Sequence, residues 1–307
     1  MRAIFWKELS DHFGRRRFGL MLGLVLVGAA WAMFIDKDAI VQGGGTGAFY
    51  LDIFTSTLGV PISLLSFLSF FGPIIGITLG FDSINSERTQ GTLSRILAQP
   101  VYRDAVYNGK FLAGLFTLTI VVLSLGIAAV GIAMFRFGLP PTGDETLRLI
   151  GFGFVTIGYL AFWLALAMTA SIYLRNAVAS ALVSIGIWIG ISFFVGFAAT
   201  AIADRMVPDV QDVDDQARHS NVQLWVGRVS PERLFSEANG TLLDPIGGRF
   251  LNPFSVAPER LEGLLLSPVP ASQSLLLVWP HIVVMLAMIA SLMSVSYVRF
   301  MREEIRS

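Results

Sequence analysis

The chain has 307 residues, of which 54% are hydrophobic and only 14% are charged, and its formal net charge is zero. Soluble domains carry about 25% charged residues, so this composition predicts an integral membrane protein. The neutral balance gives no basic surface for nucleic acid, and the absence of cysteine excludes disulfides, thiolate metal sites and a cysteine nucleophile.

The first segment, residues 1–17, is predicted to be an amphipathic helix. Phe5, Leu9 and Phe13 recur at helical spacing on one face, and charged side chains occupy the other. An apolar stretch, 18–35, follows a cluster of arginines. Because an amphipathic segment precedes that cluster and the apolar run is long, an uncleaved membrane span is favoured here over a signal peptide.

Six apolar stretches are long enough to cross a bilayer, which takes about 20 residues because the backbone polar groups must pair within the span. They cover residues 18–35, 58–81, 111–135, 149–173, 177–202 and 275–298. The fourth and fifth are separated only by Arg175 and Asn176, which predicts a tight helical hairpin with Arg175 at the water. We therefore expect an all-α integral membrane protein with six transmembrane helices in a single domain, 1–307.

Lysine and arginine near the ends of spans predict the orientation of the chain. Most of them fall in residues 1–17, in the segment 82–110 and in the C-terminal tail, which lie on one side if there are six spans. Both termini and the 82–110 loop are therefore predicted to be cytoplasmic in a protein of the cell membrane. The segment 203–274 is then a large extracytoplasmic loop.

Ionisable residues are absent from the interior of the six stretches, where Asp, Glu, Lys and Arg do not occur. Such residues are the usual mark of proton relays and ion-coupled transport, so an ion-coupled carrier is disfavoured, although sodium coupling through backbone carbonyls stays open. The histidines His12, His219 and His281 are too far apart to predict a metal site. No G-x-x-x-x-G-K-[ST] phosphate loop occurs, so we expect neither an enzyme nor a cofactor in this chain.

The segment 82–110 contains a short amphipathic pattern. Leu93, Ile96 and Leu97 share one face of a helix, Arg88 and Arg95 lie off that face, and a following proline ends the pattern. Two interpretations are open. The segment is either a solvated helical turn or a rigid knob that fits a groove on a soluble partner.

The motif Glu87-Arg88-Thr89-Gln90-Gly91-Thr92-Leu93, followed by Leu97, Pro100, Arg103 and Gly109-Lys110, resembles the cytoplasmic signature of the permease subunits of type-2 ABC exporters. The N-terminal helix is similar to their elbow helix, which lies in the membrane interface. The stretches 230–235 and 299–306 are similar to members of this family that have a long external loop.

This resemblance implies the membrane-spanning subunit of an ATP-driven exporter. Such permeases pair two membrane chains, here expected to be identical, with separate nucleotide-binding subunits that bind ATP and Mg²⁺. It implies that the coupling helix between spans two and three docks on these subunits, and that the turn at Arg175 makes a second contact. The partner-binding residues implied in the coupling segment are Glu87, Arg88, Gly91, Thr92, Leu93, Arg95, Ile96, Leu97 and Pro100.

The external loop begins with an acidic cluster, Asp209 to Asp215, which we interpret as a solvated linker rather than a metal site. Pro231 and Pro258 each stand where a short helix is predicted to begin. These helices either form a lid over the exit or cover the bundle. Three glycines at G-x-x-x-G spacing, Gly72 with Gly76 and Gly80, predict close helix packing, either within one chain or between two.

Uncharged spans suit an amphiphilic, lipid-like or drug-like substrate. The candidate contacts are Phe67, Phe70, Phe71, Phe194 and Phe197, although aromatic residues in a bundle more often serve plain packing. Two alternatives to an exporter stay open: a membrane scaffold or assembly factor that transports nothing, and an ion-coupled carrier.

Overall fold

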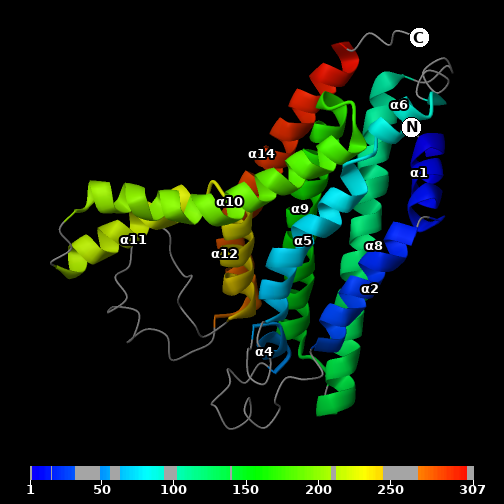
Figure 1. Ribbon diagram of the computed structural model, residues 1–307. Coiled ribbons are helices and arrows are strands. Elements are labelled where there is room, and N and C mark those ends of the chain that lie inside the picture. Colours follow the sequence, from blue (N-terminus) through cyan, green and yellow to red (C-terminus); the bar gives the residue numbers. More distant parts are fainter. Residues whose placement is uncertain are drawn as a thin grey trace.

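The computed structural model describes residues 2–14, 16–31, 49–55, 63–92, 102–138, 140–208, 212–244 and 269–302. All regular structure within these ranges is helical, which confirms the all-α class (Figure 1). The helices are α1 (Arg2–Gly14), α2 (Arg16–Trp31), α4 (Phe49–Thr55), α5 (Leu64–Gly80), α6 (Asn85–Thr89), α8 (Arg103–Phe137), α9 (Gly143–Tyr173), α10 (Ala177–Met206), α11 (Val213–Gly227), α12 (Pro231–Leu243) and α14 (Ala271–Arg302).

Five helical segments in the described part of the chain are long and apolar enough to cross a membrane: 64–89, 103–136, 143–173, 177–206 and 271–302. A shorter apolar helix covers Phe18–Ala30, so the sixth span stays a prediction. The spans extend beyond the apolar stretches. Helix α8 begins at Arg103 instead of 111, and α9 begins at Gly143 instead of 149, because their polar first turns are capped or paired.

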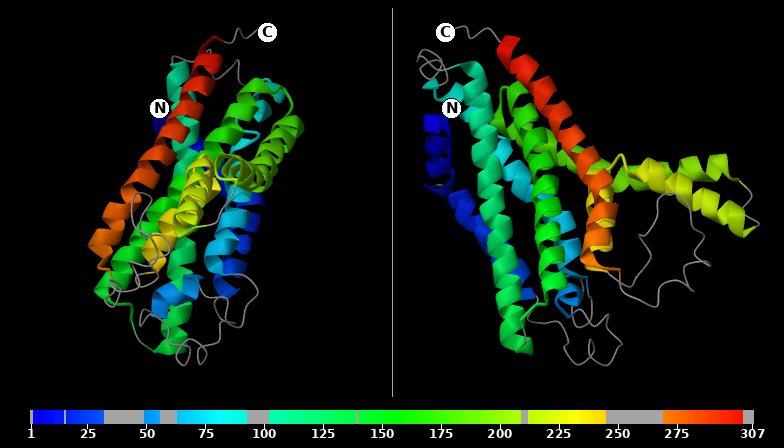
Figure 2. Two further views of the ribbon diagram at one scale, coloured as in Figure 1. Left: turned by 90° about the vertical axis from the view of Figure 1, so that its left-hand side faces the viewer. Right: turned by 180° about the vertical axis from the view of Figure 1, so that it is seen from behind.

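Helix α9 lies at the centre of the bundle, and residues 159–168 in its middle are all buried. Helices α5, α8, α12 and α14 pack around it, and α1 and α2 flank α8 (Figure 2). The side chains of Tyr159 and Trp163 are fully enclosed. The core of the fold is therefore built around this one helix.

The glycines of α5 allow it to approach α9 closely. A Cβ atom on Gly76 would lie 2.6 Å from the carbonyl oxygen of Leu160, and one on Gly80 would lie 2.7 Å from that of Leu164. By contrast, a Cβ atom on Gly186 or Gly190 of α10 would meet nothing within 4 Å. The glycine spacing of α5 therefore serves packing within the chain.

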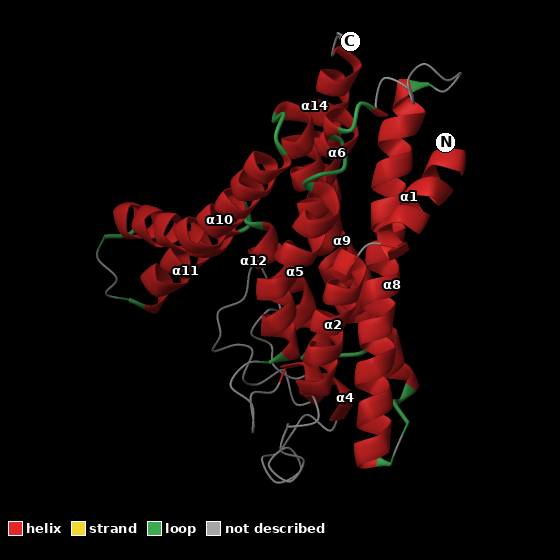
Figure 3. Ribbon diagram, turned by 45° about the vertical axis from the view of Figure 1, so that its right-hand side comes forward, coloured by secondary structure: helices red, strands yellow, loops and turns green. Residues whose placement is uncertain are grey.

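The turn between α9 and α10 is confirmed, but the predicted hairpin is wrong. Asn176 caps α10, since its Oδ1 accepts a hydrogen bond of 2.8 Å from the backbone N–H of Val178. Helix α10 then crosses away from the bundle, and α11 packs along its outer part (Figure 3). Only 17% of the most apolar part of α10 is buried. We call α10 and α11, residues 177–227, the arm.

The acidic cluster begins a helix, so its interpretation as a linker is wrong from Asp212 onward. Asp212 is the N-cap residue of α11, and Asp214 and Asp215 lie in the first turn, where carboxylates interact favourably with the helix dipole. Helix α12 begins at Pro231 as predicted. Asp209 and the helix predicted at Pro258 lie outside the described residues.

Helix α12 packs among α5, α9 and α14. Its Phe235 stacks on Tyr159 with ring centroids 4.4 Å apart, and Leu234 and Leu242 are buried beside it. Tyr159 lies near the midpoint of α9, which spans Gly143–Tyr173. The first turns of α12 are therefore level with the middle of the bundle.

The end of the bundle opposite the chain termini is held by Arg148, whose side chain is fully buried. We call its contacts the Arg148 clamp, which joins α9, α12 and α14. The guanidinium donates to Asp144 Oδ2 at 2.7 Å, Leu242 O at 2.8 Å, Ser274 Oγ at 3.0 Å and Val269 O. Asp144 also accepts from the N–H of Ala271 at 2.8 Å.

The clamp predicts that Arg148→Lys lowers stability although it keeps the charge. A single ammonium cannot reach all of these acceptors, and each buried carbonyl left unpaired costs about 1–3 kcal/mol. We expect the melting temperature in detergent to fall by several degrees. Arg205→Lys on α10, an exposed position, is the control and is expected to melt like wild type. Equal melting of the two variants would contradict the clamp.

Candidate coupling site

Helix α6, in the described part of the predicted coupling segment, lies at the end of the bundle where α1 begins and α14 ends (Figure 1). Glu87, Arg88, Gly91 and Thr92 are among the described residues. The rest of the predicted set lies outside them, namely Leu93, Arg95, Ile96, Leu97 and Pro100. The apolar docking face therefore stays a prediction, and the structure shows how its base is held.

The start of α6 is capped by a side chain of α9. The first N–H groups of a helix have no partner within the helix. Here the Oγ atom of Ser171 accepts from the N–H of Ile84 at 3.1 Å and from that of Asn85 at 3.2 Å. Past α6, Gly91 adopts a φ of +65°, a left-handed conformation that glycine takes without strain. The turn at Gly91 thus directs the chain out of α6.

Arg88 ties α6 to the end of α9. Both terminal nitrogens of its guanidinium donate to the carbonyl oxygen of Ile172 at 3.2 Å. The last carbonyls of a helix lack partners and carry partial negative charge, so a cation is favourable there. Ile172 lies just before the turn that holds Arg175, which is exposed. The two segments predicted to contact a partner are therefore joined at their bases.

Four charged side chains from three helices meet beside α6, and we call them the four-charge cluster. They are Lys7 and Glu8 of α1, Glu87 of α6 and Lys110 of α8. Lys110 Nζ lies 2.8 Å from Glu8 Oε1 and 2.9 Å from Glu87 Oε1, and Lys7 Nζ lies 3.0 Å and 3.2 Å from the same two atoms. Two positive and two negative charges balance among these four side chains, and the half-exposed Asp11 of α1 lies 3.5 Å from Lys7 Nζ at the edge of the cluster.

Glu8 and Lys7 of the cluster stay ionised near neutral pH. Burial raises the pKa of Glu8, but the ion pairs with Lys110 and Lys7 outweigh burial and hold that pKa below its usual range. Burial likewise lowers the pKa of Lys7, while Glu8 and Glu87 raise it by more. The side chain of Lys110 is only 3% exposed, and loss of one partner from a buried pair is costly. The cluster therefore binds α1 firmly to α6 and α8.

The face of α1 that is buried differs from the face predicted from the sequence. Leu9 is buried as predicted, but Glu8 is also buried and Phe13 is 41% exposed. The helix packs along α8, where the rings of Phe5 and Phe116 meet edge to face. The signal that was missed is a Lys-Glu pair beside an apolar face. Whether α1 lies in the membrane interface as an elbow helix stays a prediction.

The five phenylalanines proposed to contact substrate do not form one group. On α5, Phe67 and Phe70 each contact Phe71, with ring centroids 4.7 Å and 5.1 Å apart. Phe194 and Phe197 lie on the open side of α10, where they are 70% and 73% exposed. The structure thus gathers the three aromatic residues of α5 and leaves the other two apart.

These features define a class of protein: a multi-pass, all-helical membrane protein whose loop between two spans is braced by three neighbouring helices. Comparison with known proteins gives the family. The chain matches the model of the ABC-2 family transporter protein over residues 2–305, and it belongs to this family.

Two curated relatives have the name "Probable ABC transporter permease protein NosY". The one from Stutzerimonas stutzeri is 30% identical over 189 residues, which cover 59% of this chain and 63% of the relative. The one from Pseudomonas aeruginosa is 31% identical over 196 residues, which cover 62% of this chain and 64% of the relative. The chain therefore matches a little under two thirds of the length of each.

Proposed function

We propose that this chain is the membrane-spanning subunit of an ATP-driven exporter, and that separate nucleotide-binding subunits dock on its 82–110 loop. The observation that carries this proposal is the bracing of the coupling segment. Glu87 is held by Lys110 and Lys7, and Arg88 is held by the end of α9. A loop fixed in this way transmits a push from a soluble partner to three helices at once. ATP and Mg²⁺ belong to the partner, since this sequence has no phosphate loop.

Further parts of the proposal concern the membrane. The basic residues gathered near the chain termini support a cytoplasmic location for both ends in the cell membrane. Helix α2 is proposed as the sixth span, α1 as the elbow helix and a second copy of the chain as the other half of the pathway. The charged base of the coupling segment then faces the cytoplasm, where a nucleotide-binding subunit is available.

The test is purification of the chain with its partner. From native membranes, the wild-type chain is expected to carry a soluble phosphate-loop protein and ATPase activity. Leu93→Asp and Ile96→Asp place a charge on the predicted docking face, so we expect each to reduce the recovered partner and the ATPase by about ten-fold or more, the loss of one well-packed anchor. Ser94→Asp, off the apolar face of the same loop, is the matched control and should retain both.

The melting temperature of each variant shows whether the membrane bundle is intact. Purification of the wild-type chain without any ATPase, or full ATPase in Leu93→Asp and Ile96→Asp, would contradict the proposal.

A further inference from the structure

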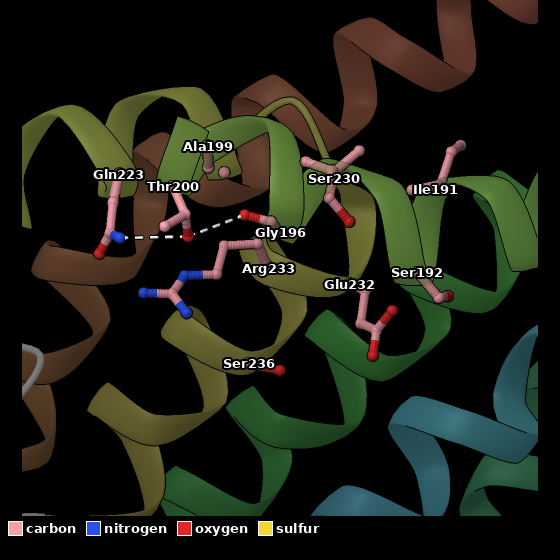
Figure 4. A pocket seen from close by; sticks show the side chains of 12 residues that line it. Ile191, Ser192, Gly196, Ala199, Thr200, Gln223, Ser230, Glu232, Arg233 and Ser236 are labelled. Carbon is pink, nitrogen blue, oxygen red and sulfur yellow. Dashed lines mark hydrogen bonds between the residues drawn. The ribbon is translucent and has the colours of Figure 1, made fainter. Parts of the chain in front are cut away.

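A polar cavity lies between the arm and the start of α12. Its volume is about 340 Å³. The hydroxyl groups of Ser192, Thr200 and Ser236 and the charged side chains of Glu232 and Arg233 line it (Figure 4). Polar walls of this kind are unusual in a chain whose spans are so apolar, and these five side chains come from two helices, α10 and α12.

Arg233 offers unused hydrogen-bond donors to this cavity. Its Nε atom donates to Glu237 Oε1 at 2.9 Å, and its terminal nitrogens make no hydrogen bond to any residue that the structure describes. Figure 4 shows the guanidinium extending into the cavity below Thr200 and Gln223. A guanidinium fork matches the geometry of a phosphate or a carboxylate. The free end of Arg233 therefore suits an anionic group.

Glu232 lines the same cavity and carries the opposite charge. Its one hydrogen bond within the described residues is long, 3.4 Å from Ser69 Oγ. By contrast, the neighbouring carboxylate of Glu237 is fully engaged, by Arg228, Arg233 and His281. The cavity thus has one available cation and one available anion in its lining, on different sides (Figure 4). A ligand that carries both a negative and a positive group satisfies both.

An apolar groove of about 460 Å³ adjoins the polar cavity. Along the turn into α12, Val229 and Pro231 line the groove while Ser230 and Glu232 line the cavity. Ile191 of α10 lines both. The two spaces therefore lie next to each other, on either side of this turn. One molecule can place a polar headgroup in the cavity and an acyl chain in the groove, which is walled further by Phe162 and by α14.

The position of Glu232 and Arg233 along the bundle bears on their function. Phe235, one turn beyond Glu232, stacks on Tyr159 near the midpoint of α9. From there α12 runs to the Arg148 clamp, and its 13 residues advance about 20 Å. Glu232 and Arg233 thus lie close to the level of the midpoint of α9, a candidate membrane span. The six apolar stretches themselves contain no Asp, Glu, Lys or Arg; these two residues belong to α12, which lies outside the stretches.

We propose that the cavity and the groove together bind a zwitterionic amphiphile, with its phosphate or carboxylate on Arg233, its amine on Glu232 and its chain in the groove. Ionisable side chains at such depth are costly and mark binding sites or pathways. Here the anionic group of the ligand would neutralise Arg233, and its amine would neutralise Glu232. The identification of this ligand as cargo rests on the proposed transport function. The binding itself does not.

The experiment measures lipid retention by the purified full chain in nanodiscs of phosphatidylethanolamine, which is zwitterionic, or phosphatidylglycerol, which is anionic. We expect Glu232→Gln and Arg233→Gln each to weaken retention of phosphatidylethanolamine by about ten-fold, the loss of one charge-assisted contact. Phosphatidylglycerol should respond to Arg233→Gln and not to Glu232→Gln. Arg205→Gln, exposed on α10, is the control.

Soluble phosphoethanolamine distinguishes the headgroup from the whole lipid. It is expected to compete only weakly, and competition as strong as that of the lipid would overturn the role of the groove. Wild-type retention of phosphatidylethanolamine by Glu232→Gln would overturn the site. Glu232→Gln preserves the shape of the side chain and affects only one long hydrogen bond within the protein. Its lipid retention therefore tests the site even if Arg233→Gln lowers the melting temperature. Lipid retention is measured on the chain without its partner and should survive in Leu93→Asp, so the two proposals fail separately.

Discussion

A chain carrying Gly76→Leu is expected to lose most of its monodisperse, folded population. The Cβ atom alone would lie 2.6 Å from the carbonyl oxygen of Leu160 and 2.8 Å from the Cβ atom of Trp163. The first of these belongs to the backbone of α9, so no side-chain rotation relieves the clash. Overpacking costs about 1–3 kcal/mol at a typical site and more where the backbone must move. Size-exclusion chromatography and thermal melting in detergent measure the loss.

The matched control for this prediction is Gly190→Leu. Gly190 occupies the same G-x-x-x-G spacing with Gly186, but a Cβ atom there meets nothing within 4 Å. This variant should give a wild-type elution profile for the single chain. If Gly76→Leu eluted and melted like Gly190→Leu, the close packing of α5 on α9 would be refuted.

Removal of the charge of Lys110 is the second change with a large expected effect. Lys110→Met keeps the length of the side chain but leaves the buried carboxylates of Glu8 and Glu87 with only the half-exposed Lys7 between them. Breaking a buried ion pair by removing one partner costs about 3–5 kcal/mol. We expect a marked fall in melting temperature and faster proteolysis of α1, which loses its buried ion pair to α8.

Lys7→Met tests whether burial of Lys110 is the reason for the large effect expected of Lys110→Met. The side chain of Lys7 is 51% exposed, against 3% for Lys110, and exposed ion pairs contribute only about 0–1 kcal/mol. Its melting temperature should therefore change little. A double-mutant cycle of Lys110→Met with Glu87→Gln should show coupling between the two sites, because the variants share one buried pair. Independent, additive effects would argue against the four-charge cluster.

The long helices could be predicted because continuous apolar runs leave few alternatives in a membrane. Their ends could not, since a helix continues into polar sequence wherever the charges are satisfied. Helix α9 begins with a capping box between Thr142 and Glu145, and α8 carries Lys110 because two carboxylates meet it. Only the folded chain shows these partners.

The region after α10 was predicted least well. Helix α11 is polar, so it produced no apolar periodicity, although acids in its first turn were a local signal. The start of α12 could be predicted from Pro231. Its position inside the bundle could not, because that position depends on contacts such as Phe235 on Tyr159, made across a large separation in sequence.

The coupling site shows the same division. Glu87 and Arg88 could be selected from a motif, but the groups that hold them come from distant parts of the chain. Ser171 lies in an apolar run and Lys7 near the N-terminus, and neither gave a sign of its partner in sequence. The glycine spacing of α5 left two interpretations open until the atoms opposite Gly76 were known.

Helix α9 is anchored at both ends, and this has a mechanical consequence. Its 31 residues extend about 46 Å, from the Arg148 clamp to the carbonyl that Arg88 binds. A fully hydrogen-bonded helix resists compression along its axis. Under the proposed function, a force applied to the coupling segment is carried along α9 to the Arg148 clamp, and through the clamp to the ends of α12 and α14 that meet there.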